Sequence, residues 1–134
     1  MRTLYDEDID YLEVVEEGIP NYAVQATPAL LLFLSESDRT VVGFALENAT
    51  EHLKDLDVVS PKVRLAGVLR LMRGVRHLNQ EELAKITNIG VRTLQRAEAG
   101  DANLTFDNLI NLAQAAPKID LSVVLKPMRK VKGR

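Results

Sequence analysis

The 134-residue sequence predicts an α+β fold, in which a small antiparallel β-sheet with one helix precedes an all-α region that ends in a β-strand. Two observations predict this class. Short β-rich runs dominate residues 1–59, whereas apolar residues recur at helical spacing after Pro61. The charge changes at the same place, from a net −10 over residues 1–60 to a net +8 over residues 61–134. We therefore expect two modules, 1–59 and 60–134, with different partners.

Four β-rich runs predict strands in the acidic module, and the turn-forming stretches EEGIP, TP and SESD separate them. The runs are YLEVV, NYAVQA, ALLLFLS and TVVGFALE. Because the last two flank SESD, they predict a β-hairpin. The next stretch, NATEHLKDL, predicts a short amphipathic helix with Leu53 and Leu56 facing inward and Asn48 or Thr50 as its cap.

Ser60 and Pro61 favour a helix start, because serine is a good cap and proline fits the first helical position. Leu65, Leu69 and Met72 then recur along one helical face. Helices are predicted at residues 62–77, 80–87, 91–98 and 105–115. The alternating run IDLSVVL predicts a C-terminal strand, and KPMRKVKGR predicts a mobile basic tail.

The composition excludes several classes of protein and site. There is no cysteine, so disulfides and thiolate metal sites are impossible, and His52 and His77 stand alone in the sequence. The acidic N-terminus lacks the apolar segment of a secretory signal, and the longest apolar run, ALLLFL, is too short to cross a bilayer. We expect a cytoplasmic protein with no cofactor and no membrane contact.

The stretch LNQEELAKITNIGVRTLQRAEAG predicts two short helices joined by a tight turn. Asn88 stands at the turn, where a left-handed backbone is needed and asparagine tolerates it. The second helix carries Arg92, Gln95 and Arg96 on its polar side, and such side chains can read base edges from a helix in the major groove. The apolar underside is formed by Leu83, Ala84, Ile89, Leu94 and Ala97. The pattern predicts a helix-turn-helix that binds double-stranded DNA.

Residues 62–117 resemble the helix-turn-helix domain of the lambda-repressor/Cro-like family, also called the XRE family. That family has an arginine on its first helix, then Gln-x-x-Leu-Ala, a turn residue, and Glu-x-Gly after the recognition helix. The matching residues are Arg73, Gln80, Leu83, Ala84, Asn88, Glu98 and Gly100. The resemblance implies a Cro-like fold and a structural ion pair between Arg73 and Glu98.

The candidate DNA-binding residues lie at the starts of the two helices and along the recognition helix. Gln80 can donate to a phosphate oxygen, and Asn79 caps its helix. An arginine can bind guanine bidentately, glutamine can pair with adenine, and Val91 can contact a thymine methyl group. The full set is Asn79, Gln80, Gly90, Val91, Arg92, Thr93, Gln95 and Arg96.

The acidic N-terminus resembles a calcium loop in part, since Asp6, Asp8 and Asp10 alternate and Glu17 falls at the twelfth position. The required glycine of such a loop would be Tyr11, at the start of a predicted strand, so we expect a solvated edge and no metal site. Residues 1–57 also resemble a small bacterial domain family of unknown function, which implies no activity. The residues that carry this resemblance are Tyr5, Asp6, Asp10, Val42, Gly43, Phe44, Asn48 and Ala49.

These features favour a bacterial-type transcription regulator, specifically a repressor, and no enzyme, since a nucleophile, a base and a metal cluster are all missing from the pattern. LAQAAPKIDLSVVLKP also resembles regulators of toxin–antitoxin operons, so an antitoxin with a cognate toxin is the leading narrower hypothesis. The alternative is a protein-interaction adaptor that does not bind DNA tightly. Two residues favour this alternative, because Asn88 replaces the usual turn glycine and Asp101 follows the recognition helix. A small hydrolase is the third hypothesis.

One recognition helix covers only a few base pairs, so we expect a homodimer with two such helices about 34 Å apart. Two apolar β segments could form its interface, because unpaired strands tend to find other strands. They are the predicted strand at residues 119–125 and the N-terminal sheet.

Overall fold

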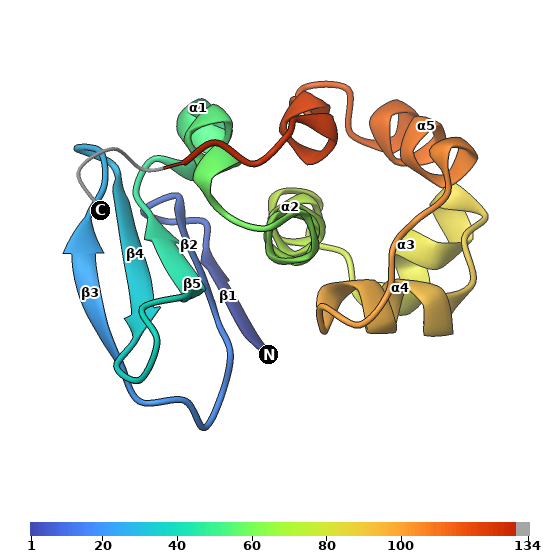
Figure 1. Ribbon diagram of the computed structural model, residues 1–134. Coiled ribbons are helices and arrows are strands. Elements are labelled where there is room, and N and C mark those ends of the chain that lie inside the picture. The colour runs from blue at the N-terminus through green and yellow to red at the C-terminus, as the bar shows by residue number, and fades with distance from the viewer. Residues whose placement is uncertain (131–134) are drawn as a thin grey trace.

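The computed structural model describes residues 1–130 as a five-stranded antiparallel sheet beside a group of helices, with helix α2 between them (Figure 1). The sheet order is β1-β2-β5-β4-β3. Its strands are β1 (Arg2–Asp6), β2 (Tyr11–Val15), β3 (Asn21–Gln25), β4 (Leu30–Ser35) and β5 (Val41–Leu46). The helices are α1 (Ala49–His52), η1 (Leu53–Val58), α2 (Pro61–Arg76), α3 (Gln80–Thr87), α4 (Val91–Glu98), α5 (Phe106–Ala115) and η2 (Ser122–Leu125), where η marks a 3-10 helix. The predicted α+β class is confirmed.

The predicted strands and helices are present with small differences. The four β-rich runs form β2 to β5, with β4 and β5 as the predicted hairpin, whereas none of these runs includes β1. The four longer helices form α2 to α5, and the stretch after β5 divides into α1 and η1. Among the described residues, no helix has the length and apolar character needed to span a bilayer.

Three of the residues that carry the N-terminal resemblance, Tyr5, Asp10 and Ala49, meet at the turn between β1 and β2. The Tyr5 hydroxyl donates to the Asp10 carboxylate at 2.7 Å, and the Thr50 hydroxyl donates to it at 2.6 Å. The Ala49 amide donates to the Asp10 carbonyl at 2.9 Å. Burial and the bond to Asp10 raise the pKa of Tyr5, so its phenol stays a donor. These contacts join the end of β5 to the β1–β2 turn and occupy Asp10.

Helix α2 packs against the sheet on one side and against the other helices on the opposite side (Figure 1). Two glycines permit close approach to the sheet. A Cβ atom at Gly67 would lie 2.8 Å from Cζ of Phe44, and one at Gly74 would lie 2.3 Å from the Tyr5 ring. The hydrophobic core is therefore continuous from the sheet to α3, α4 and α5. The expected boundary near residue 60 coincides with the start of α2, a helix that both modules share.

The predicted C-terminal strand at residues 119–125 is wrong, because this segment forms a turn followed by η2. The Asp120 carboxylate accepts from the Ser122 amide at 2.9 Å, and such a local bond competes with strand formation. Two apolar residues of this run pack into the core instead. Ile119 and Val123, four residues apart, both face inward and are buried.

Arg64 holds the C-terminal segment from inside the protein. Its side chain is 0% exposed and donates to four backbone carbonyls, at 2.6 Å for Val59 and 2.9 Å for Val123. Burial lowers the pKa of Arg64. The four acceptors are the carbonyls of Asp57, Val59, Val123 and Lys126. One buried guanidinium thus joins η1 to η2.

Arg129, in the predicted mobile tail, is bonded to Asp57 of η1. Arg129 donates to both carboxylate oxygens of Asp57, at 3.0 and 3.1 Å, and its amide donates to the Asp57 carbonyl at 2.7 Å. This contact joins Arg129 to η1, whereas the mobility of the tail stays a prediction. Residues 131–134 of the tail lie outside the described residues.

Arg64→Met should lower the free energy of unfolding by about 3 kcal/mol, because it leaves buried carbonyl oxygens without a donor. Urea denaturation of the full chain measures this. Arg129→Met is the matched control, because it removes an exposed guanidinium that also bonds the C-terminal segment to η1. It should have a small effect on the free energy of unfolding. Equal stability of the two variants would contradict the role given to Arg64.

Candidate nucleic-acid interface

Helices α3 and α4 are short, and the sequence between them fixes a tight turn. Asn79 caps α3, as predicted: its side chain accepts from the Glu82 amide at 2.7 Å, and Glu82 accepts from the Asn79 amide at 3.0 Å. The helix ends at Asn88, which has the expected left-handed backbone with φ of 57°. Gly90 then precedes α4 without a side-chain cap. The two helices are thus joined by residues 88–90 alone.

The predicted apolar underside is confirmed, since all five of its side chains are buried. They are Leu83, Ala84, Ile89, Leu94 and Ala97. Helix α5 supports the turn, because the Asn111 side chain donates to the Thr87 carbonyl at 3.0 Å. The Thr87 hydroxyl in turn donates to the Leu83 carbonyl at 2.7 Å. The end of α3 is therefore fixed by hydrogen bonds as well as by packing.

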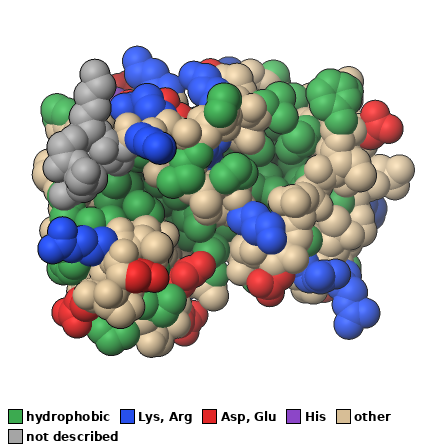
Figure 2. Space-filling view, in the orientation of Figure 1, with side chains coloured by type: hydrophobic (Ala, Val, Ile, Leu, Met, Phe, Trp, Pro, Cys, Tyr) green, Lys and Arg blue, Asp and Glu red, His purple; other side chains and the backbone are tan. Residues whose placement is uncertain are grey.

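The opposite side of α4 is polar and accessible. Arg92, Gln95 and Arg96 are exposed, while Val91 and Thr93 are half-buried. Within residues 1–130, neither Arg92 nor Arg96 forms an ion pair with a carboxylate. Figure 2 shows basic side chains projecting at the lower right, where Figure 1 places α3 and α4. The structure thus brings five of the eight candidate residues together on α4, with Gly90 just before it.

Arg73 and Glu98 form a bidentate ion pair between α2 and the end of α4. Nε and Nη2 of Arg73 each donate to a Glu98 carboxylate oxygen at 2.9 Å, and Nη1 donates to the Leu78 carbonyl at 3.2 Å. Glu98 is only 5% exposed. Because α2 also packs on the sheet, this pair fixes the position of α4 relative to the rest of the molecule.

Gln80 takes part in this cluster, which sequence reasoning missed. Its Nε2 donates to Glu98 at 3.2 Å, so the side chain lies against the end of α4. The two residues are eighteen positions apart, and no local pattern predicts their contact. A glutamine amide has two hydrogens, so one remains for a phosphate oxygen. Gln80 can therefore position α4 and still contact DNA.

Two exposed carboxylates flank the candidate residues. Glu81 follows Gln80 in the first turn of α3, and Asp101 follows α4, with its amide bonded to the Arg96 carbonyl at 2.8 Å. Phosphates carry negative charge, so these side chains would weaken contacts to the DNA backbone. Lys85 adds an exposed cation on α3. The surface around α4 is consequently mixed in charge.

The described residues contain no group of three or more histidine, aspartate or glutamate side chains that could hold a metal ion. At the N-terminus, one Asp6 oxygen accepts from the Asp8 amide at 3.0 Å, and Asp10 is bonded to Tyr5 and Thr50. The alternating carboxylates therefore make local hydrogen bonds in the β1–β2 turn.

Comparison with known proteins supports a helix-turn-helix in the second half of the chain. Residues 69–122 match the model of a protein family described as helix-turn-helix. The matched segment contains α3, α4, α5 and the second half of α2, and so includes Arg73, Glu98 and every candidate DNA-binding residue. The search of curated proteins and the search of solved structures each found no match. The match therefore supports the assignment of α3 and α4 as a helix-turn-helix.

Glu98→Ala should lower the free energy of unfolding by about 3 kcal/mol, because it leaves the largely buried Arg73 guanidinium without its carboxylate. Glu81→Ala removes an exposed carboxylate from the same helix pair and serves as the control. Urea denaturation of both full-length variants gives the comparison. If Glu98→Ala is as stable as Glu81→Ala, the ion pair does not fix α4.

Proposed function

We propose that this chain is a sequence-specific DNA-binding transcription regulator that acts as a repressor. The observation that carries the proposal is the polar side of α4, where Arg92, Gln95 and Arg96 are exposed above a fully buried underside. An exposed helix face needs only soluble side chains, whereas this one carries the donors that read guanine and adenine in the major groove. The family match to residues 69–122 supports the same conclusion.

In the proposed complex, α4 lies in the major groove and α3 meets the phosphate backbone. Arg92 and Arg96 bind guanine edges, Gln95 pairs with adenine, and Val91 contacts a thymine methyl group. Gly90 has no side chain and lets the start of α4 come close to the DNA. The remaining contacts, to phosphates, come from Asn79, Gln80 and Thr93.

The proposed regulator is a homodimer, and an exposed apolar face on α5 and η2 supports this assembly. Helix α5 buries only Leu112 of its ten residues. Phe106 is 67% exposed and Leu125 is 63% exposed, which is unusual for large apolar side chains that have no partner. We define the α5–η2 face as Phe106, Leu109, Ile110, Ala113, Leu121 and Leu125.

The α5–η2 face contains an apolar groove of about 170 Å³ between α5 and η2, and Phe106 is one of its lining residues. A twofold axis through the face would let each copy insert its Phe106 into the groove of the other, as an isologous interface requires. The 119–125 segment thus remains an interface candidate, as a 3-10 helix and not as a strand. The N-terminal sheet is the second candidate.

The narrower role of antitoxin rests on the stretch LAQAAPKIDLSVVLKP alone. The strand that this resemblance implies is replaced by η2. Stable co-purification with the product of an adjacent gene would support the antitoxin role. The adaptor hypothesis has its own supporting observation, since Glu81 and Asp101 are exposed beside the candidate DNA-binding residues. A gel shift with the DNA upstream of the gene separates the adaptor from the regulator.

Arg92→Ala and Arg96→Ala should each weaken binding to the operator by about 1–3 kcal/mol and relax sequence preference at one base position. Gln80→Ala should weaken binding to all sequences more evenly, because it loses a phosphate contact. Fluorescence anisotropy with operator and scrambled duplexes at fixed salt measures both effects. Unchanged operator affinity in both arginine variants would remove α4 as the recognition helix.

Phe106→Asp should convert the dimer to a monomer, because it places a carboxylate in the proposed apolar interface. Ile9→Asp is the matched control, since Ile9 is also largely exposed but lies in the β1–β2 turn. Light scattering at tens of micromolar gives the mass of each full-length protein. A dimeric Phe106→Asp protein would move the interface to the N-terminal sheet, and a monomeric wild type would exclude the dimer.

A further inference from the structure

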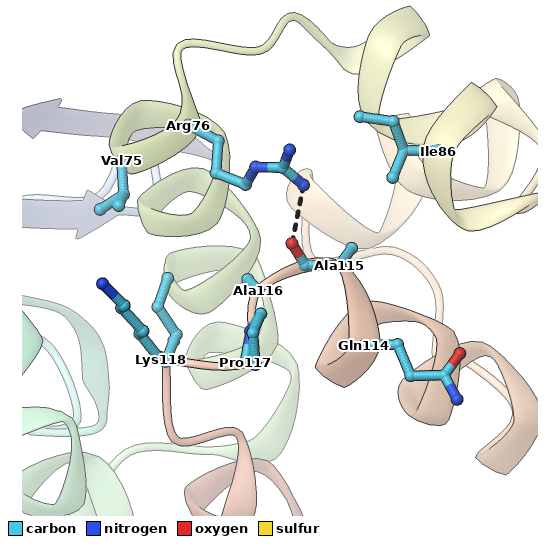
Figure 3. A pocket seen from close by; sticks show the side chains of 9 residues that line it. Val75, Arg76, Ile86, Gln114, Ala115, Ala116, Pro117 and Lys118 are labelled. Carbon is cyan, nitrogen blue, oxygen red and sulfur yellow. Dashed lines mark hydrogen bonds between the residues drawn. The ribbon is translucent and has the colours of Figure 1, made fainter.

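A cavity of about 540 Å³ lies where the C-terminal ends of α2, α3 and α5 converge (Figure 3). Val75 from α2 and Ile86 from α3 form parts of its apolar lining, and Pro117 closes it beyond the end of α5. Val75 is 39% exposed and Ile86 is 48% exposed, so both offer apolar surface to a molecule in the cavity. A mostly apolar cavity of this size, with a few polar groups, is the usual form of a small-molecule site.

Two cations stand at this cavity. Nη1 of Arg76 donates to the Ala115 carbonyl at 2.7 Å, which holds the guanidinium between α2 and α5 and leaves its other nitrogens available (Figure 3). Lys118 is exposed and lines the cavity beyond Pro117. None of the described residues that line the cavity is acidic.

The partial charges of the helix ends must be compared with the charges of these two cations. The C-terminal end of a helix carries a partial negative charge of about half an elementary charge, and the ends of α2, α3 and α5 all meet here. Without Arg76 and Lys118 the cavity would disfavour an anion. Two full positive charges exceed the partial charges of the helix ends, so the cavity attracts one negative group next to an apolar surface.

We propose that this cavity binds a small apolar molecule that carries one carboxylate. The apolar part packs against Val75, Ile86 and Pro117. The carboxylate accepts from the free nitrogens of Arg76, and planar guanidinium groups suit this contact. Lys118 adds a second positive charge at the border of the cavity. The site goes beyond the proposed function and does not depend on DNA binding.

The test is an NMR titration of the full-length, ¹⁵N-labelled protein without DNA. The probes are 1-naphthylacetate and its uncharged amide, 1-naphthylacetamide, which share one apolar group and differ in charge. We expect saturable shifts at residues 75–76, 86 and 114–119, and affinity for the acid about tenfold higher than for the amide.

Charge-removing variants assign the contact. Arg76→Gln and Lys118→Gln should each reduce affinity for the acid towards that of the amide and leave affinity for the amide unchanged. Lys85→Gln removes an exposed cation outside the cavity and should change neither. Arg76 also bonds to Ala115. If Arg76→Gln alters the fold for this reason, the affinities of Lys118→Gln for the acid and the amide decide the test.

Three outcomes would overturn the proposal. Equal affinity for acid and amide would mean that the cations only neutralise the helix ends. Shifts confined to the α5–η2 face would place the probe at the proposed dimer interface. The absence of saturable shifts at millimolar probe would mean that the cavity does not bind this class of molecule.

Discussion

The burial of α2 on two sides is the constraint on which the rest of the structure depends. Gly67 and Gly74 let the helix approach the sheet more closely than any side chain would allow. The same helix supplies Arg64, which holds the C-terminal segment through four carbonyls, and Arg73, which holds the end of α4 through Glu98. The sheet and α4 are therefore held by the same helix, so the acidic module is part of the scaffold of the helix-turn-helix.

The sequence predicts the helices well because their signals are local. Asn79 and Asn88 fix the ends of α3 through a capping box and a left-handed turn, and both signals can be read within a few residues. The fold class and the β4–β5 hairpin follow from apolar runs and turns in the same way. The candidate residues of α4 follow from helical periodicity, which separates the buried underside from the exposed polar side.

Other features depend on contacts that no local pattern contains. The run IDLSVVL alternates like a strand, but Asp120 makes a turn and no sheet edge receives the segment, so it becomes η2. Arg64 reads as one more surface cation, yet it is the largest fully buried side chain. The bond of Gln80 to Glu98 and the anchoring of Arg129 on Asp57 join residues far apart in the sequence. Such contacts become visible only once α2 is placed between the two modules.

In the proposed regulator, the mixed charge around α4 gives base contacts and a second copy a larger share of the affinity than general attraction to phosphate. Selection of bound duplexes from a random pool, followed by sequencing, tests this account most directly. It predicts enrichment of an inverted repeat whose half-sites lie about one helical turn apart. Recovery of duplexes with no shared sequence would contradict the account.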